Sequence, residues 1–96
     1  MVVVILLRFG ENKHLAKDHM RGHNEWIQAG VDDGVFLLVG SIAGGQGGAI
    51  LAHGVTRDQI QQRVQSDPLV EHGIAVPEII LIEPAILDKR LALLRG

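Results

Sequence analysis

Blocks of hydrophobic residues alternate with polar and glycine-rich segments along the chain, and their lengths predict a series of strands. Short blocks rich in Val, Ile and Leu are typical of buried strands. We expect strands at residues 2–7, 35–42, 48–53 and 74–82. Pro77 has no amide donor, so the last of these strands should lie at an edge of the sheet or contain a bulge.

Between the first two blocks, apolar residues recur every three or four positions, which is the period of an amphipathic helix. We expect one helix from Lys13 to Asp33, with Asn12 as its N-cap and Gly34 as its stop. The side predicted to be buried carries Leu15, Met20 or His19, His23, Trp26, Ile27 and Gly30.

A second helix is predicted from Thr56 to about Gln65, because Thr56 and Gln59 have the spacing of a capping box. The segment Ser66-Asp67-Pro68 then begins another short turn, in which Ser66 or Asp67 caps the helix and Pro68 takes its first position. The last residues, 87–95, are apolar and basic, and they suit either a short helix or an arm that reaches a neighbour.

The predicted order is β-α-β-β-α-β, which is the ferredoxin-like arrangement of the α+β class. Helices cover only one face of such a sheet, yet the blocks 2–7, 35–39 and 79–82 are apolar at consecutive positions. Both faces of these strands are therefore hydrophobic, and an exposed apolar sheet face is typical of an association surface. We expect two copies to stack their sheets in a symmetric homodimer.

Length and composition exclude several classes of protein. The 96 residues are enough for one small domain, so we expect a single domain over 1–96 with 85–96 as a C-terminal tail. A formal charge of −2 gives no electrostatic case for binding nucleic acid or an anionic membrane. The chain has no cysteine, which excludes disulfides and thiolate zinc sites. Residues 2–7 are too short to span a bilayer and carry no signal-peptide pattern, so we expect a cytoplasmic protein.

The candidate chemistry is concentrated between His19 and Trp26. Histidine takes and returns a proton near neutral pH, and a carboxylate on one ring nitrogen fixes its tautomer. Asp67 is the candidate carboxylate for His23, although spacing alone also allows a buried polar histidine and an aspartate that is only a helix cap. His19 and His23 have the spacing of a metal-binding pair, but a third ligand is evident only as His14, His53 or His72. We expect no metal and no cofactor.

The run Gly44-Gly45-Gln46-Gly47-Gly48 resembles a phosphate-binding loop only in composition. Such a loop needs a strand before it, a helix after it and usually a Lys-Ser/Thr pair. Here predicted strands flank both sides, which favours a flexible hairpin that could cover a cleft.

Together these residues resemble the YciI-like (YCII-related) family over roughly residues 2 to 84. The resemblance rests on His23 with Trp26 three residues later and Gly34 eleven residues later, on a strand ending Gly40-Ser41-Ile42, and on Asp67-Pro68-Leu69 with Gly73. Two positions depart from the common pattern. Met20 stands where an Arg is frequent, with Arg21 displaced by one, and His72 stands where many members have a small residue.

The resemblance implies a dimeric α+β barrel with a His–Asp pair, here His23 and Asp67, in a cleft of each subunit. One chemistry associated with the family is dehydrochlorination of a chlorinated hydroxyhydroquinone in aromatic compound degradation, and the fold is similar to that of muconolactone isomerases. We therefore expect a cofactor-independent lyase that acts on a small oxygenated ring compound. The alternatives are a muconolactone-isomerase-like isomerase and a non-catalytic dimer that binds a small ligand. A third hypothesis, a haem or metal protein, is supported by the histidine residues alone.

In this scheme His23 moves the proton and Asp67 steadies the imidazolium. His72, one turn after Asp67, is a third candidate catalytic residue, as a second acid or a hydroxyl-binding group, and an exposed histidine is the alternative. Arg8, Phe9 and His19 are the candidate substrate-binding residues, because Arg8 and Phe9 could meet an anionic or aromatic substrate. A plain surface charge is the alternative for Arg8.

Overall fold

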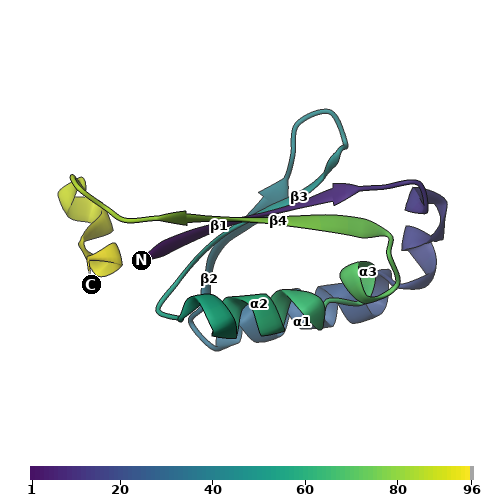
Figure 1. Cartoon of the computed structure of the whole chain (residues 1–96), viewed down its shortest axis with the longest axis horizontal. Helices are drawn as coiled ribbons and strands as arrows, with labels where there is room; N and C mark the ends of the chain where they lie inside the picture. Colours follow the sequence, from purple (N-terminus) through teal and green to yellow (C-terminus); the bar gives the residue numbers. More distant parts are fainter. Residues whose placement is uncertain (96) are drawn as a thin grey trace.

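The structure, a computed structural model that describes residues 1–95, is an α+β fold in which helices cover one face of a single sheet (Figure 1). Its elements are β1 (Val2–Phe9), η1 (Lys13–Asp18), α1 (Met20–Asp32), β2 (Phe36–Ser41), β3 (Gly47–His53), α2 (Arg57–Gln65), α3 (Pro68–Glu71), β4 (Ala75–Ile82) and η2 (Lys89–Leu94), where η denotes a 3-10 helix. The predicted ferredoxin-like order is confirmed.

The sheet has four strands in the order β2-β3-β1-β4, and all neighbouring strands are antiparallel. Pro77 lies in β4, at an edge of the sheet, as its missing amide donor predicts. The glycine-rich residues join β2 to β3 as a hairpin, so the hairpin interpretation is correct.

The two faces of the sheet differ in burial, because successive side chains of each strand point to opposite faces. Val3, Ile5 and Leu7 of β1 point toward the helices and are almost fully buried. They form one core with side chains from the helices and the segments around them: Ile60, Val64, Leu69 and Ile74. Figure 1 shows α1, α2 and α3 on one side of the sheet, and the exposed side chains of Leu38, Val76 and Ile80 lie on the opposite side, the open face.

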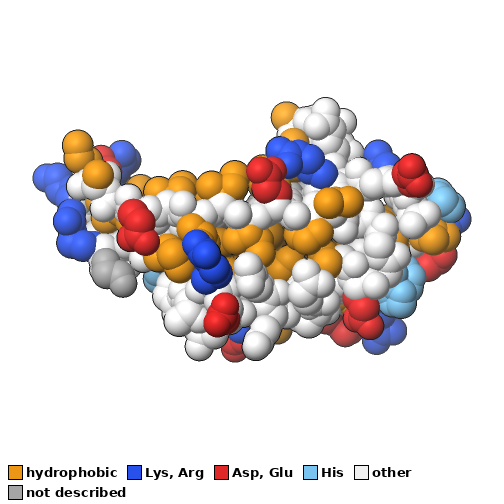
Figure 2. All heavy atoms as spheres, in the orientation of Figure 1, with side chains coloured by type: hydrophobic (Ala, Val, Ile, Leu, Met, Phe, Trp, Pro, Cys, Tyr) orange, Lys and Arg blue, Asp and Glu red, His pale blue; other side chains and the backbone are white. Residues whose placement is uncertain are grey.

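That open face is hydrophobic across the whole sheet. Cross-strand pairing places Leu38, Leu51, Val4 and Ile80 in one row, with one residue from each strand. Leu38 is 64% exposed and Val76, further along β4, is 61% exposed. Figure 2 shows hydrophobic side chains along the edge of this face, above the helical layer.

The single helix predicted from Lys13 to Asp33 is in fact two elements. η1 ends at Asp18, and α1 begins at Met20 after His19, whose φ of −122° and ψ of 4° are not helical. No residue of η1 is buried, and Leu15, predicted to face the core, is 39% exposed. Only Ala16 of this segment is partly buried against the core, so little packing holds η1 in register with α1.

The predicted caps of α2 and α3 are confirmed, whereas Asn12, which precedes η1, forms no side-chain cap hydrogen bond. The Thr56 hydroxyl accepts from the Gln59 amide and the Gln59 side chain accepts from the Thr56 amide, which completes the capping box of α2. Between the alternatives Ser66 and Asp67, Asp67 caps α3, and Pro68 takes the first helical position. In the described residues no helix is long and apolar enough to cross a membrane.

Candidate active site

His23 lies on the inward side of α1, and only 8% of its surface is exposed. Its Nδ1 is 2.7 Å from Oδ1 of Asp67, which is completely buried. The structure therefore brings together the two residues that were predicted to form a pair, although they lie far apart along the chain. A contact of this length is typical of a strong hydrogen bond to a carboxylate.

Asp67 is fixed by the local structure of the chain that follows α2. Its extended backbone and the proline after it begin α3, and Oδ1 accepts from the Leu69 amide at 3.1 Å. The same oxygen also meets His23, so the carboxylate caps a helix and positions an imidazole at once.

Gly22 explains how α1 comes close enough to α3 for this contact. A Cβ at position 22 would lie 3.1 Å from Cγ of Pro68, which is tighter than an ordinary van der Waals contact. Because glycine has no side chain, the two helices approach closely just where His23 and Asp67 meet. Glycine at position 22 weakens α1 by about 1 kcal/mol relative to alanine, but it allows this close packing of α1 on α3.

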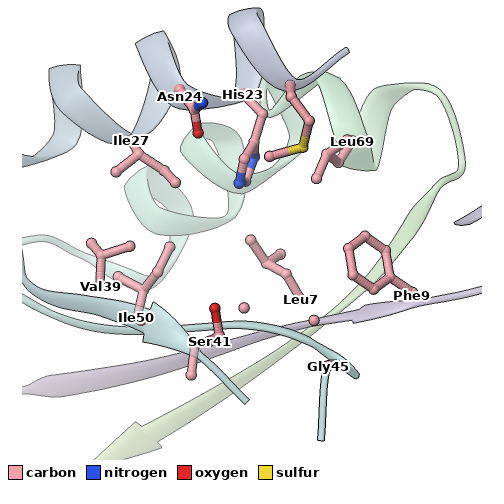
Figure 3. A pocket seen from close by; sticks show the side chains of 15 residues that line it. Leu7, Phe9, His23, Asn24, Ile27, Val39, Ser41, Gly45, Ile50 and Leu69 are labelled. Atoms are coloured by element: carbon pink, nitrogen blue, oxygen red, sulfur yellow. The ribbon is translucent and has the colours of Figure 1, made fainter. Parts of the chain in front are cut away.

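The hydrogen bond also defines the tautomer of His23. A carboxylate can only accept, so Nδ1 carries the proton and Nε2 of a neutral ring has a free lone pair. Figure 3 shows the ring pointing from α1 into an open space above the sheet. His23 is therefore oriented to act as a base toward a molecule in that space.

The second oxygen of Asp67, Oδ2, is buried and has no hydrogen-bond partner among residues 1–95. Leaving a buried polar atom without a partner costs about 1–3 kcal/mol, so few such atoms persist in folded proteins. Polar groups that do persist in this state are often functional. Asp67 is therefore a candidate functional residue as well as a helix cap.

The space in front of His23 is a cavity of about 320 Å³. α1 and α3 form its roof and the sheet forms its floor, with the hairpin between β2 and β3 at one end (Figure 3). Its walls comprise Leu7, Phe9, Met20, His23, Asn24, Ile27, Val39, Gly40, Ser41, Gly45, Gly47, Gly48, Ala49, Ile50 and Leu69.

The floor of this cavity is hollow because of one glycine. Gly48 pairs with Ser41 of β2 and Leu7 of β1, in a row of the sheet that faces the helices. A Cβ at position 48 would have only an ordinary contact, 3.6 Å from the Gly40 carbonyl oxygen. The missing side chain, and not a distorted backbone, therefore leaves room for a ligand.

Asn24 and Ser41 are functional candidates that the sequence reasoning did not identify. Asn24 follows His23 on α1 and Ser41 ends β2, and both line the cavity (Figure 3). The alternation of β2 could have pointed to Ser41, but the strand has a bulge between Phe36 and Leu38 that shifts its register. No sequence signal distinguished Asn24 from an ordinary exposed asparagine.

The other predicted site residues lie in different places. Phe9 lines the cavity, whereas Arg8 points to the open face of the sheet and forms an ion pair with Glu78. His19 and His72 are not in the cavity wall; their rings stack on each other with centroids 4.1 Å apart. The structure thus separates Arg8, His19 and His72 from the His23 cavity of the same chain.

The histidines also do not converge on a metal. His19 stacks on His72 while His23 turns toward Asp67, so the pair with metal-ligand spacing diverges. Within residues 1–95, no group of three or more His, Cys, Asp or Glu side chains is arranged to hold a metal ion.

Trp26 supports His23 from the next turn of α1. Its ring stacks near the imidazole, with centroids 5.9 Å apart, and packs edge-on against Phe36. The indole Nε1 donates to the carbonyl oxygen of Arg63 at 2.8 Å, which ties α1 to α2. Trp26 is thus a partly buried residue that packs against the core beside His23.

Comparison with known proteins supports the fold. No protein-family model matches the chain, and no curated protein matches its sequence. Among solved structures, the chain is similar to 5-chloro-2-hydroxyhydroquinone dehydrochlorinase (TftG) from Burkholderia phenoliruptrix AC1100, in complex with 2,5-dihydroxybenzoquinone. The TM-score is 0.74 at 12% sequence identity, over 88% of this chain and 96% of that one. At this identity the likeness establishes a shared fold.

Proposed function

We propose that the protein is a cofactor-independent lyase of the YciI-like type that acts on a small oxygenated ring compound. The observation that carries the proposal is the buried His23–Asp67 hydrogen bond of 2.7 Å at the wall of an apolar cavity of about 320 Å³. A buried base with an oriented carboxylate partner in such a cavity is a common arrangement for proton transfer.

The best-supported reaction is dehydrochlorination of a chlorinated hydroxyhydroquinone. The solved structure with the same fold is named as a dehydrochlorinase of 5-chloro-2-hydroxyhydroquinone, and it binds a dihydroxybenzoquinone. The cavity of this chain suits a ring of similar size, with apolar walls and a few polar groups.

In the proposed mechanism, Nε2 of His23 removes a proton from a hydroxyl or ring carbon of the substrate. The electron pair left behind moves into the ring as an enolate-like species, and the carbon that carries chlorine takes up a proton, which gives a keto tautomer. Loss of a second hydroxyl proton then expels chloride with the electrons of the C–Cl bond and leaves a quinone. The net loss is H⁺ and Cl⁻, so the reaction needs no electron acceptor. Asp67 stabilises the imidazolium, and such acid–base catalysis contributes about 10²–10⁴-fold.

The test is chloride release from 5-chloro-2-hydroxyhydroquinone under anaerobic conditions, with wild type, His23→Ala and Asp67→Asn. We expect release by the wild type, and a loss of about 10²-fold or more in each variant. Thr56→Ala, which removes a cap far from His23, is the control for a general loss of stability. Normal turnover by His23→Ala would refute the mechanism.

A wild type that releases no chloride would refute the dehydrochlorination. Exchange of a ring proton with solvent deuterium would then point to the isomerase alternative, and binding without exchange would point to a ligand-binding protein.

We also propose that the chain forms a homodimer through the open face of the sheet. The row Leu38–Leu51–Val4–Ile80 crosses all four strands, and a contiguous exposed apolar patch often marks a protein–protein interface. A second copy is the partner we propose, because one apolar patch can pair with the same patch of another copy about a two-fold axis.

A further inference from the structure

The polar side chains of the cavity lie on two opposing walls. His23 and Asn24 come from α1, and Ser41 comes from β2 in the sheet below. Figure 3 shows the Ser41 hydroxyl directed up into the cavity and the His23 ring directed down into it, with hydrophobic side chains between them. A ring that fills the cavity would therefore meet polar groups on both sides.

The Ser41 hydroxyl is available for such a contact. The other serine, Ser66, donates its hydroxyl to the Arg63 carbonyl oxygen at 2.7 Å. Ser41 has no such protein partner among residues 1–95 and is exposed, so its hydroxyl is free to form a hydrogen bond with a ligand oxygen. Gly48, its neighbour on β3, leaves the space beside it open.

The cavity wall carries no lysine or arginine. Met20 takes part in the wall, while the Arg21 side chain is 94% exposed and pairs with Glu25. The charge closest behind His23 is the carboxylate of Asp67. A carboxylate on the ligand would lose its hydration here without gaining a cation, which is unfavourable.

Lys13 comes nearest to an exception, because it touches two residues of the wall from outside. Its ammonium donates to the Gly45 carbonyl oxygen at 3.3 Å and lies 5.2 Å from the centre of the Phe9 ring. These contacts hold the charge at the rim, between η1 and the hairpin, and Lys13 is not part of the cavity wall.

We propose that Ser41 is a specificity-determining residue that binds an oxygen substituent on the far side of the ring from His23. The site then selects uncharged rings with oxygen substituents at opposite positions and disfavours rings that carry a carboxylate. The inference rests on the proposed function only in taking this cavity as the ligand site.

The experiment measures binding of three probes by NMR titration of ¹⁵N-labelled protein under anaerobic conditions. Hydroquinone has two opposed hydroxyls, phenol has one, and 4-hydroxybenzoate replaces one hydroxyl by a carboxylate. We expect hydroquinone to bind most tightly, with shifts at His23 and Ser41. Ser41→Ala should weaken hydroquinone by about three- to tenfold, the effect of one neutral hydrogen bond, and should leave phenol unchanged.

Two variants control for indirect effects. Ser41→Thr keeps the hydroxyl and suits a strand, so it should retain the preference for hydroquinone. Ser66→Ala makes the same chemical change outside the cavity and should bind all three probes as the wild type does.

Three results would overturn the inference: no binding of hydroquinone, equal weakening of phenol and hydroquinone by Ser41→Ala, or tighter binding of 4-hydroxybenzoate than of hydroquinone. If that last preference disappeared in Lys13→Met, the rim lysine would be the group that recruits an anion. The proposed lyase fails separately: absence of chloride release together with Ser41-dependent hydroquinone binding would reject the reaction and keep the binding site.

Discussion

Asp67 concentrates two stabilising contacts on one oxygen atom and leaves the other oxygen buried without a partner. The hydrogen bond from the Leu69 amide stabilises the start of α3, whereas the hydrogen bond to His23 serves the proposed proton transfer. Substitutions at this residue can therefore separate the two, because asparagine is as good a helix cap as aspartate.

We expect Asp67→Asn to retain most of the stability of the protein while its chloride release collapses. The asparagine oxygen can still accept from the Leu69 amide, so the free energy of unfolding should fall by about 1 kcal/mol or less. Asp67→Ala removes the cap and leaves the buried His23 Nδ1 unpaired, which should cost about 2–4 kcal/mol. Urea denaturation of both variants measures the difference, and equal destabilisation would show that the cap is not an independent role.

A second residue-scale prediction concerns Gly48. Gly48→Val should fill the floor of the cavity without strain, because its Cβ has only an ordinary contact and its φ is not in the left-handed region. Hydroquinone binding should be lost, while the melting temperature should stay the same or rise. Gly10→Val is the matched control: a Cβ at Gly10 also has only an ordinary contact, 3.6 Å from Cγ2 of Val76, and Gly10 is not in the cavity wall, so this variant should still bind. A Gly48→Val protein that binds as well as the wild type would place the ligand elsewhere.

At the scale of elements, the sequence predicted the strands, the order of the fold and both confirmed caps, because each depends on local patterns. Hydrophobic blocks define strands, and Thr56 with Gln59 or Asp67 with Pro68 define helix starts without help from distant residues. The break at His19 was missed, because apolar period continues through residues 13–18 although none of them is buried.

The orientation of Arg8 shows why part of the site could not be predicted. In a strand with one buried face, alternation tells which side each residue takes. Val2 to Leu7 are apolar at every position, so the pattern gives no sign of which face Arg8 joins. The contact between His23 and Asp67 likewise needed either the resemblance or the structure, since the approach of α1 to α3 depends on Gly22.

Gly22 provides an element-scale prediction. Gly22→Ala should raise the helix propensity of α1 by about 1 kcal/mol, but its Cβ would press on Pro68 at 3.1 Å. We expect these effects to offset each other in stability, while the helices separate by a few tenths of an ångström and activity drops. The NMR signal of the His23 Nδ1 proton, which reports the bond to Asp67, should weaken or shift. An unchanged signal with unchanged chloride release would mean that α1 accommodates the methyl group.

At the scale of the whole molecule, the open sheet face is the feature that a single chain does not explain. Leu38 at 64% and Ile80 at 40% exposure are strands apart yet lie in one row, together with Leu51 and Val4. Figure 2 shows hydrophobic side chains along the edge of this face. Arg8 and Glu78 pair on the same face and satisfy each other's charge, so they do not prevent a second sheet from packing there.

We therefore expect the wild type to sediment as a dimer and Leu38→Lys to sediment as a monomer in analytical ultracentrifugation. A lysine in the middle of two stacked sheets would have to lose its hydration, which costs far more than one apolar contact contributes. Val31→Lys is the matched control, because Val31 is also exposed, at 43%, but lies on α1 in the helical layer. That variant should remain a dimer.

A wild type that sediments as a monomer, or a Leu38→Lys protein that remains a dimer, would show that the open face is not the interface. The His23 cavity lies on the other side of the sheet, so a monomeric Leu38→Lys protein should keep its Ser41-dependent binding of hydroquinone.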